Sequence, residues 1–155
     1  TRPEAPRVQA NADVVTEIDI ERPVDRVADY AGDPTNAPEW YANIDSVEWT
    51  TDPAVQVGSV VAFVARFLGR RLAYTYKIIE LVPGERLVMR TAEGPFPMET
   101  TYTWASTTDG GTHMSLRNRG EPAGFSKLLA PFMTPAMRRA NRKDLAALKA
   151  VLEAD

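Results

Sequence analysis

The chain has 155 residues, 44% of them hydrophobic and 25% charged, which are the proportions of a single globular domain. Its formal net charge of −3 argues against a nucleic-acid partner, which usually requires a basic surface. The sequence has no cysteine and one histidine, His113, so disulfides, thiol nucleophiles and metal sites built on thiolates or paired histidines are excluded. No apolar run reaches the roughly 18 residues of a membrane span, and we expect a cytoplasmic protein without stable membrane insertion.

The N-terminal region predicts a tail followed by a strand. Residues 1–11 are polar and contain two prolines, so we expect a flexible tail in front of a single ligand-binding domain over residues 12–155. From Val14 to Ile20 apolar residues alternate with Glu and Asp, which is typical of a half-buried strand.

Two short helices are expected next. Pro23 opens an amphipathic helix, which Asp33-Pro34 ends. Pro38 begins a second helix, which is expected to carry Trp40, Tyr41 and Ile44.

The central part of the chain is strand-like. Its segments are separated by turn signals such as Pro83-Gly84 and Asp109-Gly110-Gly111, and short turns between consecutive strands favour an antiparallel meander. The predicted strands are Ser46–Thr51, Ser59–Leu68, Arg71–Val82, Arg86–Thr91, Thr100–Ser106 and Thr112–Arg119.

The last part is helical from about Phe125. One apolar stripe is expected to contain Phe125, Leu128, Leu129, Phe132 and Met133. A second stripe contains Leu145, Leu148, Val151 and Leu152. Pro131 and Pro135 are expected to kink or divide this span. The element order predicts an α+β domain: a curved antiparallel sheet of about seven strands wrapped on the long C-terminal helix, with two short helices after the first strand.

Turn positions predict which residues share a face of the sheet. A two-residue loop at Gly69-Arg70 would pair Phe63 with Tyr76 and Ala65 with Tyr74. A loop at Pro83-Gly84 would pair Ile78 with Met89 and Glu80 with Leu87. The residues placed on the inner face are Val61, Phe63, Ala65, Phe67, Leu72, Tyr74, Tyr76, Ile78, Glu80, Leu87 and Met89, continued by Tyr102, Trp104, Met114, Leu116 and Asn118.

This inner face is rich in aromatic side chains with polar tips. A solid core prefers Leu, Ile, Val and Phe, because a buried hydroxyl or indole N–H needs a partner. Tyrosines on one apolar face fit a ligand pocket with a few polar contacts. The alternative is a filled core whose hydroxyls reach the rim of the sheet, and the residues alone leave both interpretations open.

The order of these segments resembles the SRPBCC superfamily (START, polyketide cyclase/dehydrase-like and Bet v 1-like proteins). The matching segments are Val14–Pro23 with the following helix, Pro38-Glu39-Trp40, Gly58-Ser59-Val60, "YKIIELVP" with "GERLVMRT", and Gly120-Glu121-Pro122-Ala123-Gly124-Phe125, over about residues 12–154. The resemblance implies a helix-grip fold with a cavity for an apolar or aromatic ligand such as a lipid, sterol or polyketide. We expect no cofactor. Some members are cyclases or aromatases, so the fold does not settle the function.

The sequence therefore predicts a ligand-binding cavity and no metal site, and it does not identify a catalytic residue. The predicted binding residues are Trp40, Tyr41, Phe63, Ala65, Phe67, Tyr74, Tyr76, Ile78, Met89, Tyr102, Trp104, Met114, Leu116, Asn118, Leu129 and Met133. The expected partner is an apolar small molecule, and no feature decides whether the chain forms a homodimer.

Several single residues have two interpretations. His113 is either a general base or an exposed strand residue, and its predicted face favours exposure. Arg66 is expected on the outer face. Glu80 is either a buried acid or a rim carboxylate paired with an arginine. Asn118 either binds a ligand carbonyl or caps the entry to the last helix, and Trp40 and Tyr41 either close the cavity or pack the helices.

Three functions remain for the whole chain. The first is a carrier or sensor of an apolar molecule. The second is a polyketide cyclase or aromatase that uses Tyr74, Tyr76 or Glu80 for proton transfer. The third is a protein-binding domain with a filled cavity. The basic residues Arg138, Arg139, Arg142 and Lys143 form either a solvated helix face or a patch for an anionic membrane.

Overall fold

The computed structural model describes residues 12–67, 69–94, 96–121 and 130–154; the predicted tail over residues 1–11 lies outside these ranges. The helical elements are α1 (Val24–Ala31), the 3-10 turn η1 (Pro34–Asn36), α2 (Ala37–Trp40) and α3 (Ala130–Glu153). The strands are β1 (Ala12–Ile20), β2 (Ile44–Trp49), β3 (Val60–Phe67), β4 (Arg70–Val82), β5 (Arg86–Glu93), β6 (Met98–Ser106) and β7 (Thr112–Gly120).

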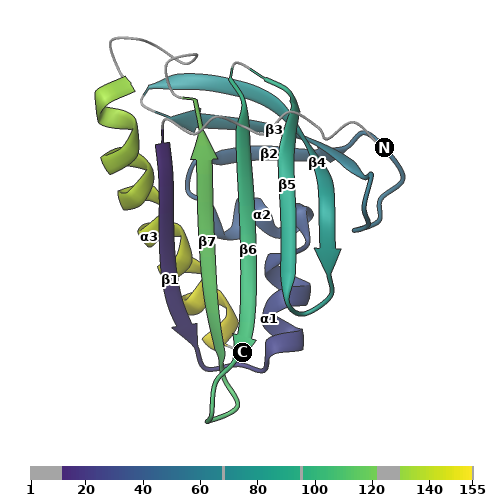
Figure 1. Ribbon diagram of the computed structural model, residues 1–155, viewed down its shortest axis with the longest axis vertical. Coiled ribbons are helices and arrows are strands. Elements are labelled where there is room, and N and C mark those ends of the chain that lie inside the picture. Colours follow the sequence, from purple (N-terminus) through teal and green to yellow (C-terminus); the bar gives the residue numbers. More distant parts are fainter. Residues whose placement is uncertain (1–11, 68, 95, 122–129, 155) are drawn as a thin grey trace, which may run out of the picture.

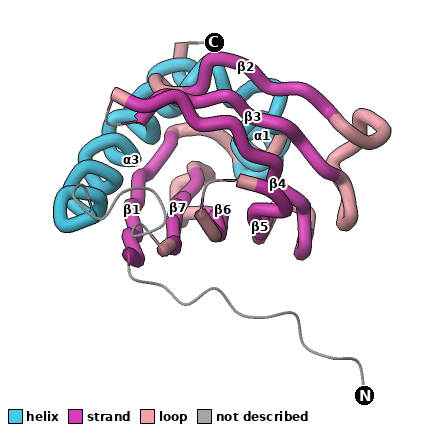
Figure 2. The backbone as a smooth tube through the Cα atoms, turned by 90° about the horizontal axis from the view of Figure 1, so that it is seen from above, coloured by secondary structure: helices cyan, strands magenta, loops and turns pink. Residues whose placement is uncertain are grey.

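The seven strands form one antiparallel sheet in the order β1-β7-β6-β5-β4-β3-β2 (Figure 1). Seen from above, the sheet curls so that β2 and β3 lie across from β1, β7 and β6 (Figure 2). Helix α3 runs along the open side of this curl and packs against β1 and α2. This arrangement confirms the predicted α+β helix-grip fold.

The alternating pattern explains the sheet, because every second side chain points into the curl. Val61 and Phe63 of β3 and Met114 and Leu116 of β7 are buried, whereas their sequence neighbours are more exposed. The predicted alignment of β6 with β7 is also confirmed: Trp104 pairs with Met114, and Tyr102 pairs with Leu116.

The predicted register of the β3–β4 hairpin is wrong by two residues. Phe63 pairs with Tyr74, and Ala65 pairs with Leu72. The turn falls before Arg70, and Gly69 adopts a φ of 76°, a conformation that glycine reaches without strain. Because the error is an even number, every side chain keeps its predicted face.

The β4–β5 pairing is correct at one end and wrong at the other. Ile78 pairs with Met89 as predicted, but Glu80 pairs with Val88 and not with Leu87, because a β-bulge lies between Ile78 and Glu80. The bulge turns Glu80 outward, so the prediction that it lies on the inner face is wrong. Leu81 packs against the core instead.

Two expectations for the helices are also wrong. Helix α2 ends at Trp40, and Ile44 begins β2 rather than belonging to the helix. In α3 the side chain of Phe132 is 61% exposed, while Met133 beside it is buried. Helix α3 continues through Pro135 without division, and Phe125, Leu128 and Leu129 lie outside the described residues.

The packing of α3 on the sheet can be tested directly by substitution. Leu148 is fully buried against the core, so we expect Leu148→Ala to lower the free energy of unfolding by about 2–5 kcal/mol. Val151 on the same helix is 37% exposed, and Val151→Ala should change the free energy of unfolding by less than about 1 kcal/mol. Urea denaturation measures both, and equal effects would contradict the packing of α3 on the sheet.

Candidate functional site

A cavity of about 140 Å³ lies between the concave face of the sheet, the short helices and α3. Residues of two apolar clusters line it: the main core, and a smaller cluster formed by Leu72, Phe96 and Met133, with Tyr74 and Met98 packed against both. For comparison, an engineered cavity of about 150 Å³ holds one benzene ring. The cavity therefore has the size of a single ring.

Most of the wall is apolar and comes from elements far apart in the sequence. The predicted binding residues that line it are Tyr41, Phe63, Ala65, Phe67, Tyr74, Tyr76, Met89, Tyr102, Asn118 and Met133. The aromatic part is ordered by ring contacts. Phe63 stacks on Tyr74 with centroids 5.4 Å apart, and Tyr76 lies edge-on to Tyr74 at 5.2 Å.

Other predicted binding residues lie in the core and not on the cavity wall. Trp40, Ile78, Trp104, Met114 and Leu116 are buried in the main apolar cluster, where they support the sheet and α2. Leu129 lies outside the described residues. Alternation along a strand predicts which face of the sheet a side chain lies on, but it does not predict how far along the strand the cavity extends. A prediction from alternation alone therefore assigns too many side chains to the cavity wall.

The tyrosine hydroxyls on the wall are hydrogen-bonded to one another and to neighbours. The hydroxyls of Tyr41 and Tyr102 lie 2.5 Å apart, and those of Tyr76 and Thr100 lie 2.9 Å apart. The Thr100 hydroxyl also donates to Oδ1 of Asn118 at 2.7 Å. Burial raises the pKa of Tyr41, Tyr74, Tyr76 and Tyr102, so these side chains remain neutral hydroxyls.

Two polar wall residues of α3 were missed by the sequence analysis. Asn141 and Asp144 are both buried, with 5% and 3% of their surface exposed. They lie three positions apart on one helix face. The signal was present: the spacing Met133, Met137, Asn141, Asp144, Leu148 continues one helical stripe, and two polar residues interrupt it.

Asp144 connects the helix to the segment after α2. Its Oδ1 accepts a hydrogen bond from the backbone N–H of Ala42 at 3.0 Å. Burial raises the pKa of Asp144 to about 6, although the Ala42 N–H and the nearby charge of Lys143 both act to lower it. The side chain therefore changes charge close to neutral pH.

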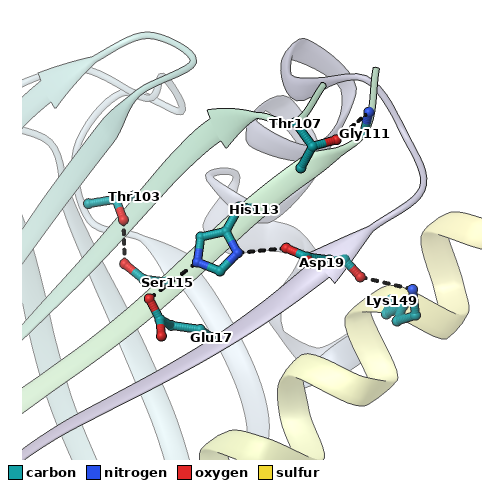
Figure 3. Close-up of polar contacts among 8 residues, drawn as sticks. All are labelled: Glu17, Asp19, Thr103, Thr107, Gly111, His113, Ser115 and Lys149. Carbon is teal, nitrogen blue, oxygen red and sulfur yellow. Dashed lines mark hydrogen bonds and ion pairs between the residues drawn. The ribbon is translucent and has the colours of Figure 1, made fainter. Parts of the chain in front are cut away.

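His113 lies on the outer face of β7 and does not line the cavity, as predicted. Figure 3 shows its ring between Asp19 and Glu17. Its Nδ1 is 2.6 Å from Asp19 Oδ1, and its Nε2 is 3.2 Å from Glu17 Oε1; these two carboxylates raise its pKa. Ser115 bonds to Thr103 and not to the imidazole. Both ring nitrogens therefore face carboxylates, and neither faces a nucleophile.

The remaining candidates lie on the surface. Arg66 pairs with Asp45 at 3.0 Å, and Glu80 pairs with Arg86 at 3.1 Å. The second pair agrees with the rim interpretation of Glu80. The basic side chains Arg138, Arg139, Arg142 and Lys143 lie on the outward side of α3 and are partly or fully exposed. None of the helices in the described ranges is long and apolar enough to cross a membrane, and no metal-ligand cluster of His, Asp and Glu occurs among the described residues.

The raised pKa of Asp144 predicts a pH dependence of stability. Between about pH 4 and 6 the folded state holds a proton that the unfolded state has released, so this group's contribution to the free energy of unfolding falls as pH rises through 6. Relative to Asp144→Asn, the wild type should lose about 1 kcal/mol between pH 5 and pH 7. Urea denaturation of both proteins at the two pH values measures the difference, and parallel pH profiles would contradict it.

Comparison with known proteins places this geometry in a family. The sequence model of the family described as "Polyketide cyclase / dehydrase and lipid transport" matches residues 11–153. The search of curated proteins gave no match.

Solved structures share the fold at low identity. TTHA0849 from Thermus thermophilus is 23% identical with a TM-score of 0.76, covering 92% of this chain and 99% of its own. The Zhui aromatase/cyclase from Streptomyces sp. R1128 is 16% identical with a TM-score of 0.77, covering 91% and 93%. Ginseng major latex-like protein 151 from Panax ginseng is 12% identical with a TM-score of 0.64, covering 90% and 95%. The chain therefore belongs to the polyketide cyclase/dehydrase and lipid transport family, within the SRPBCC superfamily.

Proposed function

We propose that the protein binds an apolar or aromatic small molecule in the cavity, as a carrier or sensor. The observation that carries this proposal is a cavity between two apolar clusters, walled by aromatic and methionine side chains and edged by tyrosine hydroxyls. Apolar walls with a few fixed polar groups are the usual construction of a small-molecule site. The volume of about 140 Å³ favours a ligand with one ring over a sterol or long lipid.

The methionines make this proposal measurable. Met89, Met98, Met133 and Met137 line the cavity, whereas Met114 is fully buried in the core beside it. We expect toluene to shift the methyl NMR signals of the four wall methionines saturably and to leave Met114 nearly unchanged. Shifts that grow linearly with toluene, or that are equal at Met114, would show non-specific partitioning and contradict the proposal.

A matched pair of substitutions tests the same cavity. Ala65 is buried on the wall, and Ala73 lies on the outer face of the neighbouring strand. Ala65→Phe should fill the cavity and weaken toluene binding at least about tenfold, while Ala73→Phe should leave binding unchanged. Thermal unfolding of both variants checks that they fold.

The natural ligand requires protein purified from its own host. Native mass spectrometry followed by extraction would identify a retained apolar compound and its class. A protein that is free of ligand and does not bind toluene would contradict a carrier role. Cytoplasmic location, a flexible tail over residues 1–11 and a homodimer remain predictions from the sequence.

A cyclase or aromatase is the second candidate, supported by the family description and by a buried acid on the wall. Because Glu80 points to solvent, Asp144 replaces it as the group that would handle a proton, next to the hydroxyls of Tyr41 and Tyr102. Tyr74 and Tyr76 would position the substrate.

The cyclase proposal can be tested by substituting Asp144, with Glu80 as the control carboxylate. With a flexible polyketide-like substrate, Asp144→Asn should slow turnover at least about a hundredfold. Glu80→Gln should leave turnover unchanged, because Glu80 is half exposed and bound to Arg86. Equal effects of the two substitutions, or none, would contradict the assignment.

A further inference from the structure

The end of the cavity where α3 meets the segment after α2 is polar, and Tyr76, Thr100 and Asn118 are further polar residues on the wall, already bonded to one another. Asn141, Asp144, Tyr41 and Tyr102 meet the cavity there, and the rest of α3 contributes Met133, Met137 and Ala140. Polar groups on an otherwise apolar wall fix the orientation of a ligand. This end therefore decides which functional group a ligand presents to α3.

Asn141 has a donor without a partner. Its Nδ2 is buried and makes no hydrogen bond among the described residues. Three other buried side-chain nitrogens share this property, those of Trp40, Trp104 and Arg119, but none of these residues lines the cavity. Leaving a buried donor without a partner is unfavourable, so a ligand atom that accepts a hydrogen bond from Asn141 is bound more tightly.

Asp144 supplies the complementary acceptor. A carboxylate can accept about four hydrogen bonds, and the structure shows Asp144 accepting one, from Ala42. The groups that act on it are Lys143 of the same helix, Tyr41 after α2 and Tyr102 of β6. The two tyrosine hydroxyls already bond to each other.

Asn141 offers a hydrogen-bond donor and Asp144 an acceptor, three positions apart on one face of α3. A ligand group that both accepts and donates a hydrogen bond would match the two. We propose that the ligand is a single-ring compound carrying a hydroxyl group, whose oxygen accepts from Asn141 Nδ2 and whose hydrogen donates to the carboxylate of Asp144. This inference rests on the proposed ligand binding in the cavity. A ring with only a carbonyl would satisfy Asn141 but would place an acceptor against a carboxylate.

Phenol and toluene are the probes, because they differ only in OH against CH₃. In the wild type at pH 7.5 we expect phenol to bind about tenfold more tightly than toluene. In Asn141→Leu and in Asp144→Asn the preference should fall to about twofold or less, with toluene affinity kept as the sign of an intact cavity. Calorimetric titration or the methionine methyl signals report both affinities.

The wild type alone gives a second test that needs no variant. Since an ionised carboxylate accepts more strongly than a carboxylic acid, the preference for phenol over toluene should be several-fold smaller at pH 5 than at pH 7.5. Acetophenone, which has only an acceptor, should show the opposite trend.

Each outcome has one meaning. Toluene binding without a preference for phenol, or a preference that survives both substitutions and the change of pH, would overturn the assignment of a hydroxyl ligand while leaving the cavity proposal intact. Binding of neither probe would overturn both. Preference for phenol that falls with each change supports the assignment.

Discussion

The structure depends on the difficulty of covering a strongly curved sheet with one helix. Seven antiparallel strands present a concave apolar face, and that face must be removed from water. Helix α3 packs against β1 at one side, and α1 packs against β6. Between these contacts the wall side chains leave a space, and Tyr74 and Met98 connect the two apolar clusters beside it. The cavity is thus a consequence of the architecture, and its size and polarity are set by the side chains that face it.

Polar side chains at this gap have to satisfy one another. The Tyr76–Thr100–Asn118 chain does so across three strands, and the Tyr41–Tyr102 pair links the end of α2 to β6. Asn141 is different, because its amide nitrogen is left without a partner in the described structure. Buried groups of this kind mark the places where a protein's own packing is incomplete and where an added molecule changes the energy most.

The fold and the inner face could be predicted from the sequence because alternation has a period of two. An even error in register leaves every face unchanged, so Phe63, Tyr74 and Tyr76 were placed correctly although their partners were not. Glu80 was placed wrongly, because a bulge adds one residue and no local signal announces it. Distances from the cavity could not be predicted, since Trp104 and Tyr102 share a face but only Tyr102 reaches the wall. Asn141 and Asp144 were predictable in principle from the interrupted stripe of α3. Because His113 is the only histidine in the sequence, it is the obvious candidate for a general base, but alternation along β7 predicts the outer face, where it lies.

The bulge in β4 divides that strand into two parts: even-numbered residues face inward before it, and odd-numbered residues face inward after it. Before the bulge, the inward-facing residues have even numbers: Leu72, Tyr74, Tyr76 and Ile78. After the bulge, the odd-numbered Leu81 faces inward. Loss or gain of one residue at this point would reverse the facing of one part of the strand without disturbing the other. The bulge therefore determines which side chains of β4 face the cavity separately from which pack around Leu81.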